Sequence, residues 1–107
     1  MINTVTIEGA LSVKPVLLES TRTGQVTEFN LEHSDLTGTE PLVYTWRCQA
    51  KGELAREISE KAMKGQVLIV AGKLIQEVVK VDGTDYPVVK LRVEQCAFGR
   101  VRAAGGV

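Results

Sequence analysis

The chain has 107 residues, 44 % of them hydrophobic, which suits one compact domain with an ordinary core and leaves no room for a second. Its net charge at pH 7 is zero, which is the main point against nucleic-acid binding, because proteins dedicated to polyanions usually carry a basic excess. No apolar stretch reaches membrane-spanning length and the start resembles no signal peptide, so we expect a cytoplasmic protein without a membrane partner.

Alternation of apolar and polar side chains predicts that most of the chain is β-strand. In chain order, the predicted strands cover residues 3–13 with a continuation at 16–19, then 25–33, 42–51, 66–81 and 86–98. Turn-forming residues separate them, including an exposed loop at 34–41 and an Asp82-Gly83 hairpin. Gly9 and Gly72 lie inside strands and offer bends at which a short sheet can coil.

The strand predicted at 42–51 has the clearest pattern in the chain. Its apolar face comprises Leu42, Tyr44, Trp46, Cys48 and Ala50, and its polar face comprises Val43, Thr45, Arg47, Gln49 and Lys51. Successive strand residues point to opposite sides of a sheet, so we expect the apolar face in the core and the polar face at the surface. Trp46 is therefore assigned to the core, although an exposed tryptophan there would be a platform for a stacked base.

Residues 52–63 form the one convincing helix, because Leu54, Ile58 and Ala62 repeat at i+4 and Gly65 supplies a left-handed stop. The order is thus three strands, one helix and two strands. This is the order of an OB fold, an all-β five-stranded Greek-key barrel with a helix between strands three and four. A six-stranded sandwich without a helix is the competing fold, and the apolar stripe on the predicted helix argues against it.

Residues that support catalysis or metal binding are scarce. The chain has two cysteines, Cys48 and Cys96, without CxxC spacing, and one histidine, His33. Neither a zinc site nor a nucleophile with its base can be assembled from these, and no glycine-rich phosphate loop is present in the sequence. We therefore predict a protein that is not an enzyme and needs no metal or cofactor.

The single predicted domain is expected to cover residues 1–99, with a short flexible tail at 100–107.

Several segments of the chain resemble the bacterial single-stranded DNA-binding proteins. These segments, spread over residues 3–98, are Asn3-Thr4-Val5-Thr6-Ile7-x-Gly9, Gly52-Glu53-Leu54-Ala55, Lys64-Gly65-Gln66-Val67 and Gly72-Lys73-Leu74, with a hairpin and Tyr86 after them. Others resemble primosomal replication protein N, a shorter relative, namely Phe29-x-Leu31-Glu32-His33, Cys48-Gln49 next to Trp46, and Glu94-Gln95. Both relatives are OB folds that bind single-stranded DNA.

The resemblance implies a sequence-tolerant binder of single-stranded DNA that acts in replication, repair or recombination, in association with the nucleoid. It also implies a homodimer or homotetramer, with replication proteins as further partners. RNA stays open as a ligand, because an OB groove accepts either type of strand. These segments do not separate a general binding protein from a primosomal one.

The chain departs from the family pattern at its end and at the stacking positions. Residues 100–102 are basic and apolar where the replicative proteins carry an acidic, partner-recruiting tail, so that recruitment is not implied. The positions of the family's stacking aromatics are Thr45, Lys51 and Val79 in this sequence. Each stacked base contributes about 1–3 kcal/mol, so we expect weaker binding than in those relatives.

The expected nucleic-acid site combines cations, neutral polar residues and two tyrosines. Its members are Tyr44, Thr45, Arg47, Gln49, Lys51, Lys73, Lys80, Tyr86, Lys90 and Arg92. The cations would follow phosphates and the tyrosines would stack on bases, Tyr44 in the case that it emerges where its strand leaves the barrel. Glu53, Glu57 and Glu60 gather on the predicted helix, so the neutral total would be sorted into a basic strand face and an acidic helix face.

The rival hypothesis is an OB-fold adaptor or structural subunit of a larger assembly, with weak or no nucleic-acid binding. Neutral net charge and the missing stacking aromatics favour it. In that case Arg47 and Lys51 belong to an ordinary solvated strand face, as charged surface residues usually do.

Overall fold

The strands close into a barrel. The computed structural model describes residues 1–22 and 24–101. In chain order its elements are β1 (Val5–Leu11), β2 (Val16–Ser20), β3 (Gly24–Asp35), β4 (Leu42–Lys51), α1 (Gly52–Lys61), β5 (Gln66–Val81) and β6 (Thr84–Val101). The strands are hydrogen-bonded in the order β1-β5-β6-β4-β3-β2, and a further pairing of β1 with β3 closes a five-stranded barrel with β2 as an extra strand. The predicted OB fold is thereby confirmed.

The first predicted strand is divided at Lys14 and Pro15, and its two parts pair with different neighbours. Proline has no N–H to donate to a ladder, so β1 continues along β5 while β2 starts again beside β3. Lys14 reaches the C-terminal end of α1, where its Nζ donates to the carbonyl oxygens of Ser59 and Ala62 at 2.9 and 2.8 Å. The cation thus satisfies carbonyl groups at the negative end of the helix.

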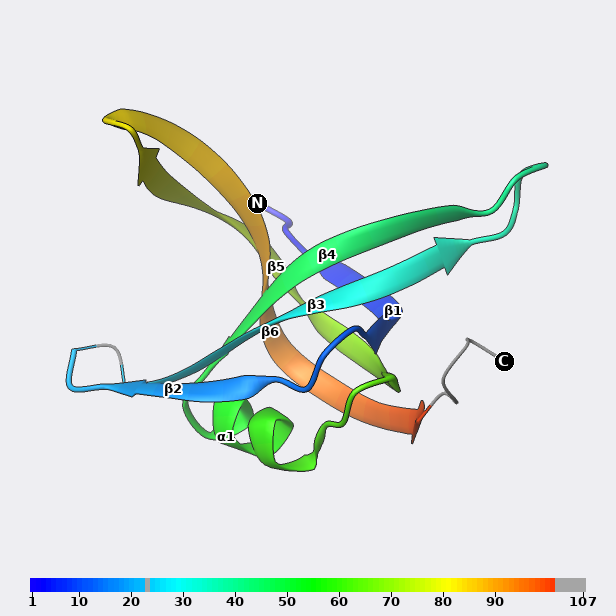
Figure 1. Cartoon of the computed structure of the whole chain (residues 1–107), viewed down its shortest axis with the longest axis horizontal. Helices are drawn as coiled ribbons and strands as arrows, with labels where there is room; N and C mark the ends of the chain where they lie inside the picture. The colour runs from blue at the N-terminus through cyan, green and yellow to red at the C-terminus, as the bar shows by residue number, and fades with distance from the viewer. Residues whose placement is uncertain (23, 102–107) are drawn as a thin grey trace.

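The helix covers one end of the barrel, below the strands in Figure 1. In its predicted apolar stripe Ile58 and Ala62 are fully buried and Leu54 is partly buried, and the helix packs mainly against β3. Together with the strands it encloses one core, which comprises Leu11, Phe29, Leu31, Cys48, Ala50, Ala55, Ile58, Ala62, Leu68, Val70, Leu91 and Val93. α1 ends at Lys61, and Gly65 follows in the left-handed conformation with a φ of 82°.

Gly72 allows β5 and β6 to approach each other closely. The register of the two strands shifts between Ala71 and Gly72, and a Cβ at Gly72 would collide with the backbone oxygen of Arg92. No side chain fits there without moving a strand, and a register shift of this kind is where the bend expected at this glycine would occur. At the far end of the hairpin, Asp82 and Gly83 have φ values of 50° and 77°, as a tight two-residue turn requires.

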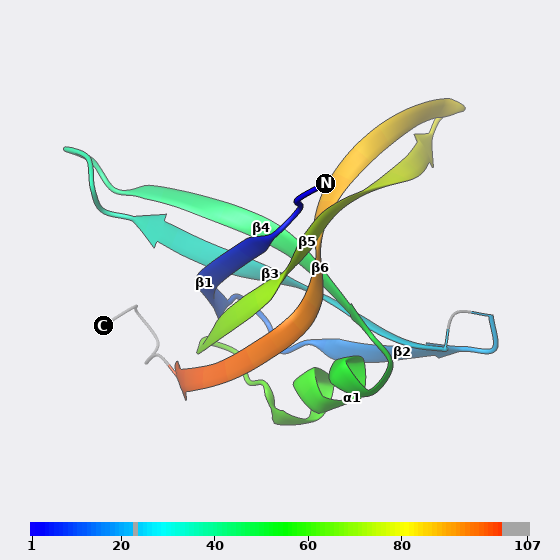
Figure 2. The same cartoon turned by 180° about the vertical axis from the view of Figure 1, so that it is seen from behind.

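Two hairpins, β3–β4 and β5–β6, extend beyond the barrel in different directions (Figure 1, Figure 2). The prediction that the whole apolar face of β4 is buried is therefore wrong. Leu42, Tyr44 and Trp46 are 54 %, 41 % and 38 % exposed, whereas Cys48 and Ala50 are fully buried. The reason is that β4 pairs with β6 only at Cys48 and its neighbour, so the outer part of the hairpin has left the barrel.

Strand β6 is longer than the predicted strand at 86–98. It ends at Val101, inside the segment expected to be a tail. Residues 102–107 of that expected tail lie outside the described residues. Across residues 1–22 and 24–101, the structure contains no helix that is long and apolar enough to cross a membrane.

Candidate nucleic-acid interface

A groove of about 680 Å³ runs over the outer surface of the barrel, where β2, β3, β4, β5 and β6 meet. Its lining residues are Leu18, Ser20, Val26, Gln49, Lys51, Ile75, Gln76, Glu77 and Arg92. The strand register explains this composition, since Gln49 lies opposite Glu28 of β3 on one side and opposite Arg92 of β6 on the other. The polar face predicted for β4 therefore continues onto both neighbouring strands.

Glu28 lies at the centre of a polar network beside the groove. Its Oε1 accepts a hydrogen bond from Arg47 Nη2 at 3.0 Å, and its Oε2 accepts from Gln49 Nε2 and Lys90 Nζ, both at 2.8 Å. Glu77 joins the network by accepting from Gln49 at 3.0 Å and from Lys90 at 3.3 Å. Four strands are thus linked through side chains that the sequence separates widely.

The network stabilises the charged forms of Glu28 and Lys90. Burial opposes the charge of Glu28, but hydrogen bonds from Lys90, Gln49 and Arg47 outweigh it and hold the pKa of the carboxyl below its ordinary value. Burial likewise acts to lower the pKa of Lys90, but Glu28 and Glu77 raise it above its ordinary value. Only 11 % of the Lys90 side chain is exposed, so this lysine is a brace between two carboxylates rather than an open cation.

The cations that line the groove or adjoin its lining are Lys51, Arg92 and Lys73. Lys51 and Arg92 line the groove, and Lys73 lies opposite Arg92 in the β5–β6 register. Arg92 donates its Nε–H to Gln49 Oε1 at 3.0 Å, which orients the guanidinium group along the network. The Nζ of Lys80 is 3.9 Å from Oδ1 of Asp85. Both side chains are mostly exposed, and an exposed ion pair of this kind contributes little to stability.

The aromatic candidates are divided between two faces. Tyr86 is 51 % exposed and lies opposite Val79, and it shares strand parity with Lys90 and Arg92 on the groove side. Tyr44 has the other parity on β4, so it is separated from Arg47 and Thr45 of the groove side. Its ring centroid is 6.3 Å from that of Trp46 on the outer part of the β3–β4 hairpin.

Sequence reasoning missed Glu28, Asn30 and Glu77 as members of the site. Asn30 accepts from Arg47 Nη1 at 3.4 Å, which ties the guanidinium to β3. Glu28 and Asn30 alternate with buried residues of β3, so the sequence pattern contained a signal that both face outward. The two carboxylates also make the expected sorting of charge incomplete, because acidic groups lie inside the basic face.

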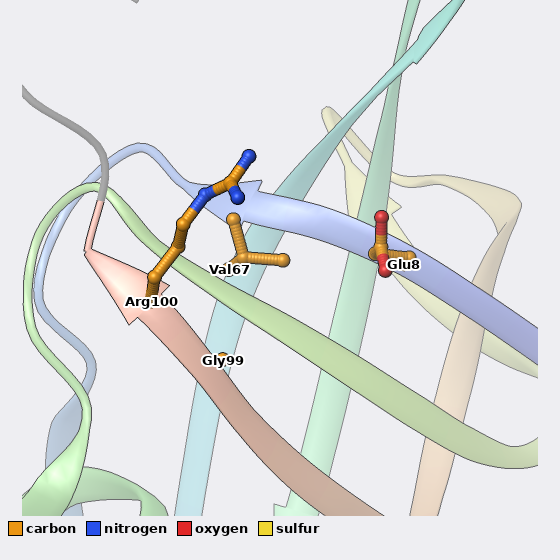
Figure 3. A pocket seen from close by; sticks show the side chains of 4 residues that line it. All are labelled: Glu8, Val67, Gly99 and Arg100. Atoms are coloured by element: carbon orange, nitrogen blue, oxygen red, sulfur yellow. The ribbon is translucent and has the colours of Figure 1, made fainter.

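A second hollow, of about 390 Å³, lies elsewhere on the sheet, between the middle of β1, the start of β5 and the end of β6 (Figure 3). Its lining includes Glu8, Val67, Gly99 and Arg100, which come from these three strands. One acidic and one basic side chain with small neighbours offer neither a stacking surface nor a run of cations. The outer groove is therefore the better candidate interface.

Comparison with known families gives a match to the single-strand binding protein family over residues 2–98. Comparison with curated proteins gives no match. The matched range covers the barrel, its helix and both hairpins, and it agrees with the OB fold. At a coarse level the activity is binding of single-stranded DNA. The chain belongs to the single-strand binding protein family.

Proposed function

We propose that the chain binds single-stranded DNA, with little regard for base sequence, along the outer groove and toward the β5–β6 hairpin. The observation that carries this proposal is the position of Lys51 and Arg92 on two strands that face one groove. Phosphates of a single strand repeat along such a path, and cations on a groove follow them without reading the bases.

The bases would contact aliphatic more than aromatic side chains. Leu18, Val26 and Ile75 line the groove beside the two cations, and Tyr86 is the aromatic ring on the same side of the sheet. Apolar side chains of any kind accept a base face, but they lack the full stacking energy of an aromatic platform. We therefore expect modest affinity that depends strongly on salt.

Fluorescence anisotropy of a labelled oligo-dT, titrated at low and near-physiological salt, tests the proposal. Binding should weaken steeply with salt, with a slope of about 0.7 per phosphate neutralised. The double variant Lys51→Ala/Arg92→Ala should lose at least tenfold in affinity. The double variant Arg56→Ala/Lys64→Ala removes the same charge from exposed positions in and after α1 and should change little. Equal losses in both variants would contradict the proposed path.

The biological setting that we propose is DNA replication, repair or recombination, in association with the nucleoid, with a primosomal role and contacts to replication proteins as finer expectations. We also propose a homodimer or homotetramer. Within the described residues, the β1 edge turned away from β5 pairs with β3 only at Ala10 and Leu11, which leaves backbone groups for another strand. Sedimentation velocity measures the assembly state, and a monomer at micromolar concentration would contradict this part.

One observation favours a second candidate function, that of a protein-binding adaptor. Leu42, Tyr44 and Trp46 form an exposed apolar surface on the β3–β4 hairpin, away from the groove. Such surfaces are typical of protein interaction sites. If the chain is an adaptor, oligo-dT or oligo-U binding is absent even at low salt, and Trp46→Ala removes the protein partner in a pull-down.

A further inference from the structure

Two carboxylates belong to the proposed interface: Glu77 lines the groove, and Glu28 lies beside it, joined to the lining residue Gln49. Each of the four carboxylate oxygens of Glu28 and Glu77 accepts a hydrogen bond from a protein donor. A carboxylate whose oxygens are engaged in this way offers little to the amino group of a base. The donors around Glu28, in contrast, are those that recognise phosphate, namely a guanidinium, an ammonium and an amide.

We propose that Glu28 is an internal counter-ion that competes with DNA phosphates for Arg47 and Lys90 and thereby limits the affinity of the groove. This inference rests on the proposed function, because it concerns the same surface. The network holds three cationic side chains, Arg47, Lys90 and Arg92, against two carboxylates, which leaves one net positive charge. A phosphate that engages Arg47 or Lys90 must first displace a carboxylate.

The two cations differ in how easily they can be released. The Arg47 side chain is 47 % exposed and is held by Glu28 Oε1 and by Asn30, so it can turn toward a strand when Glu28 is neutralised. Lys90 is held by both carboxylates and is mostly covered, so it stays with Glu77 when Glu28 is lost. Arg47 is therefore the cation that Glu28 chiefly withholds from DNA.

Glu28→Gln tests this competition, because glutamine keeps the size of the side chain and removes its charge. Oligo-dT affinity at low salt should rise by about tenfold, and the salt dependence should steepen by about 0.7, the value for one additional phosphate contact on a single strand. Glu77→Gln, which leaves the Glu28–Arg47 pair intact, should give a smaller increase. Glu60→Gln is the matched control, since it makes the same charge change at an exposed position on α1.

The outcomes separate this inference from the proposed function. Absence of binding by the parent protein at low salt overturns both. Binding by the parent, with Glu28→Gln no better than Glu60→Gln, overturns the competition alone. Weaker binding by a natively folded Glu28→Gln would also overturn it, because Glu28 would then position Arg47 for DNA. If circular dichroism shows that Glu28→Gln is unfolded, Glu77→Gln decides, and binding equal to that of Glu60→Gln overturns the inference.

Discussion

The two ends of β4 have the same alternating pattern and differ completely in burial. At the inner end, Cys48 and Ala50 are fully buried between the barrel strands and α1. At the outer end, Tyr44 and Trp46 have the same parity and are more than one third exposed. Alternation therefore sets which side of a strand a residue faces, whereas the length over which strands stay in the barrel sets whether that side is covered.

The largest effect is expected from truncating an aromatic ring beside the inner end. Phe29 lies opposite Cys48 and is 2 % exposed, so Phe29→Ala should reduce the free energy of unfolding by about 3–5 kcal/mol. Trp46→Ala at the outer end removes a larger but partly exposed ring and should cost about 1 kcal/mol. Urea denaturation measures both. Similar losses would mean that the outer end is packed in solution.

A smaller effect is expected from Lys14, which connects the β1–β2 junction to the end of α1. Lys14→Ala should reduce stability by about 1–2 kcal/mol, because two helix carbonyls lose a charged donor. Loosening α1 should also increase amide hydrogen exchange at Cys48 and Ala50 without changing it at Tyr44 and Trp46.

Lys64→Ala, at an exposed position just after the helix, is the control for the Lys14 experiment. It should leave the stability and the exchange at both ends of β4 unchanged. Increased exchange at both ends in Lys14→Ala would contradict the view that α1 covers the inner end selectively.

The polar network around Glu28 makes stability depend on pH, and this network lies at the inner half of the β3–β4 hairpin. The pKa of Glu28 is lowered in the folded protein, so its contribution to stability is present above the ordinary value of 4.5 and is lost as pH falls through the folded pKa. Glu28→Gln should therefore flatten the acid side of the stability curve and cost about 1 kcal/mol near neutral pH. Thermal melting between pH 3 and 7 measures this, and parallel curves for the two proteins would contradict it.

Much of the architecture follows from local patterns. The strand at 66–81, the Asp82-Gly83 turn and the helix after β4 were predictable because alternation, turn chemistry and i+4 spacing are short-range signals. The contact between Glu28 and Lys90 joins residues 62 positions apart, and it depends on which strands become neighbours in the closed barrel. For the same reason, the sequence placed Trp46 on the correct side of β4 but could not tell that the barrel ends before it.

The last prediction concerns the reactivity of thiols and involves the smallest effect on stability. Cysteines at the inner and outer ends of β4 should differ sharply in their rate of alkylation. Burial raises the pKa of Cys48 to about 12 and that of Cys96 to about 11, so both native thiols should react very slowly with iodoacetamide at pH 8. In Trp46→Cys, the new thiol has the same strand parity as Cys48 and lies two residues away, yet it should react at close to the rate of a free cysteine. Mass spectrometry after timed labelling identifies the modified position, and denatured protein provides the fully reactive reference. Slow labelling at position 46 would mean that another surface covers the outer end in solution, as the proposed adaptor or self-assembly would require, and repeating the measurement at lower protein concentration would separate those two explanations.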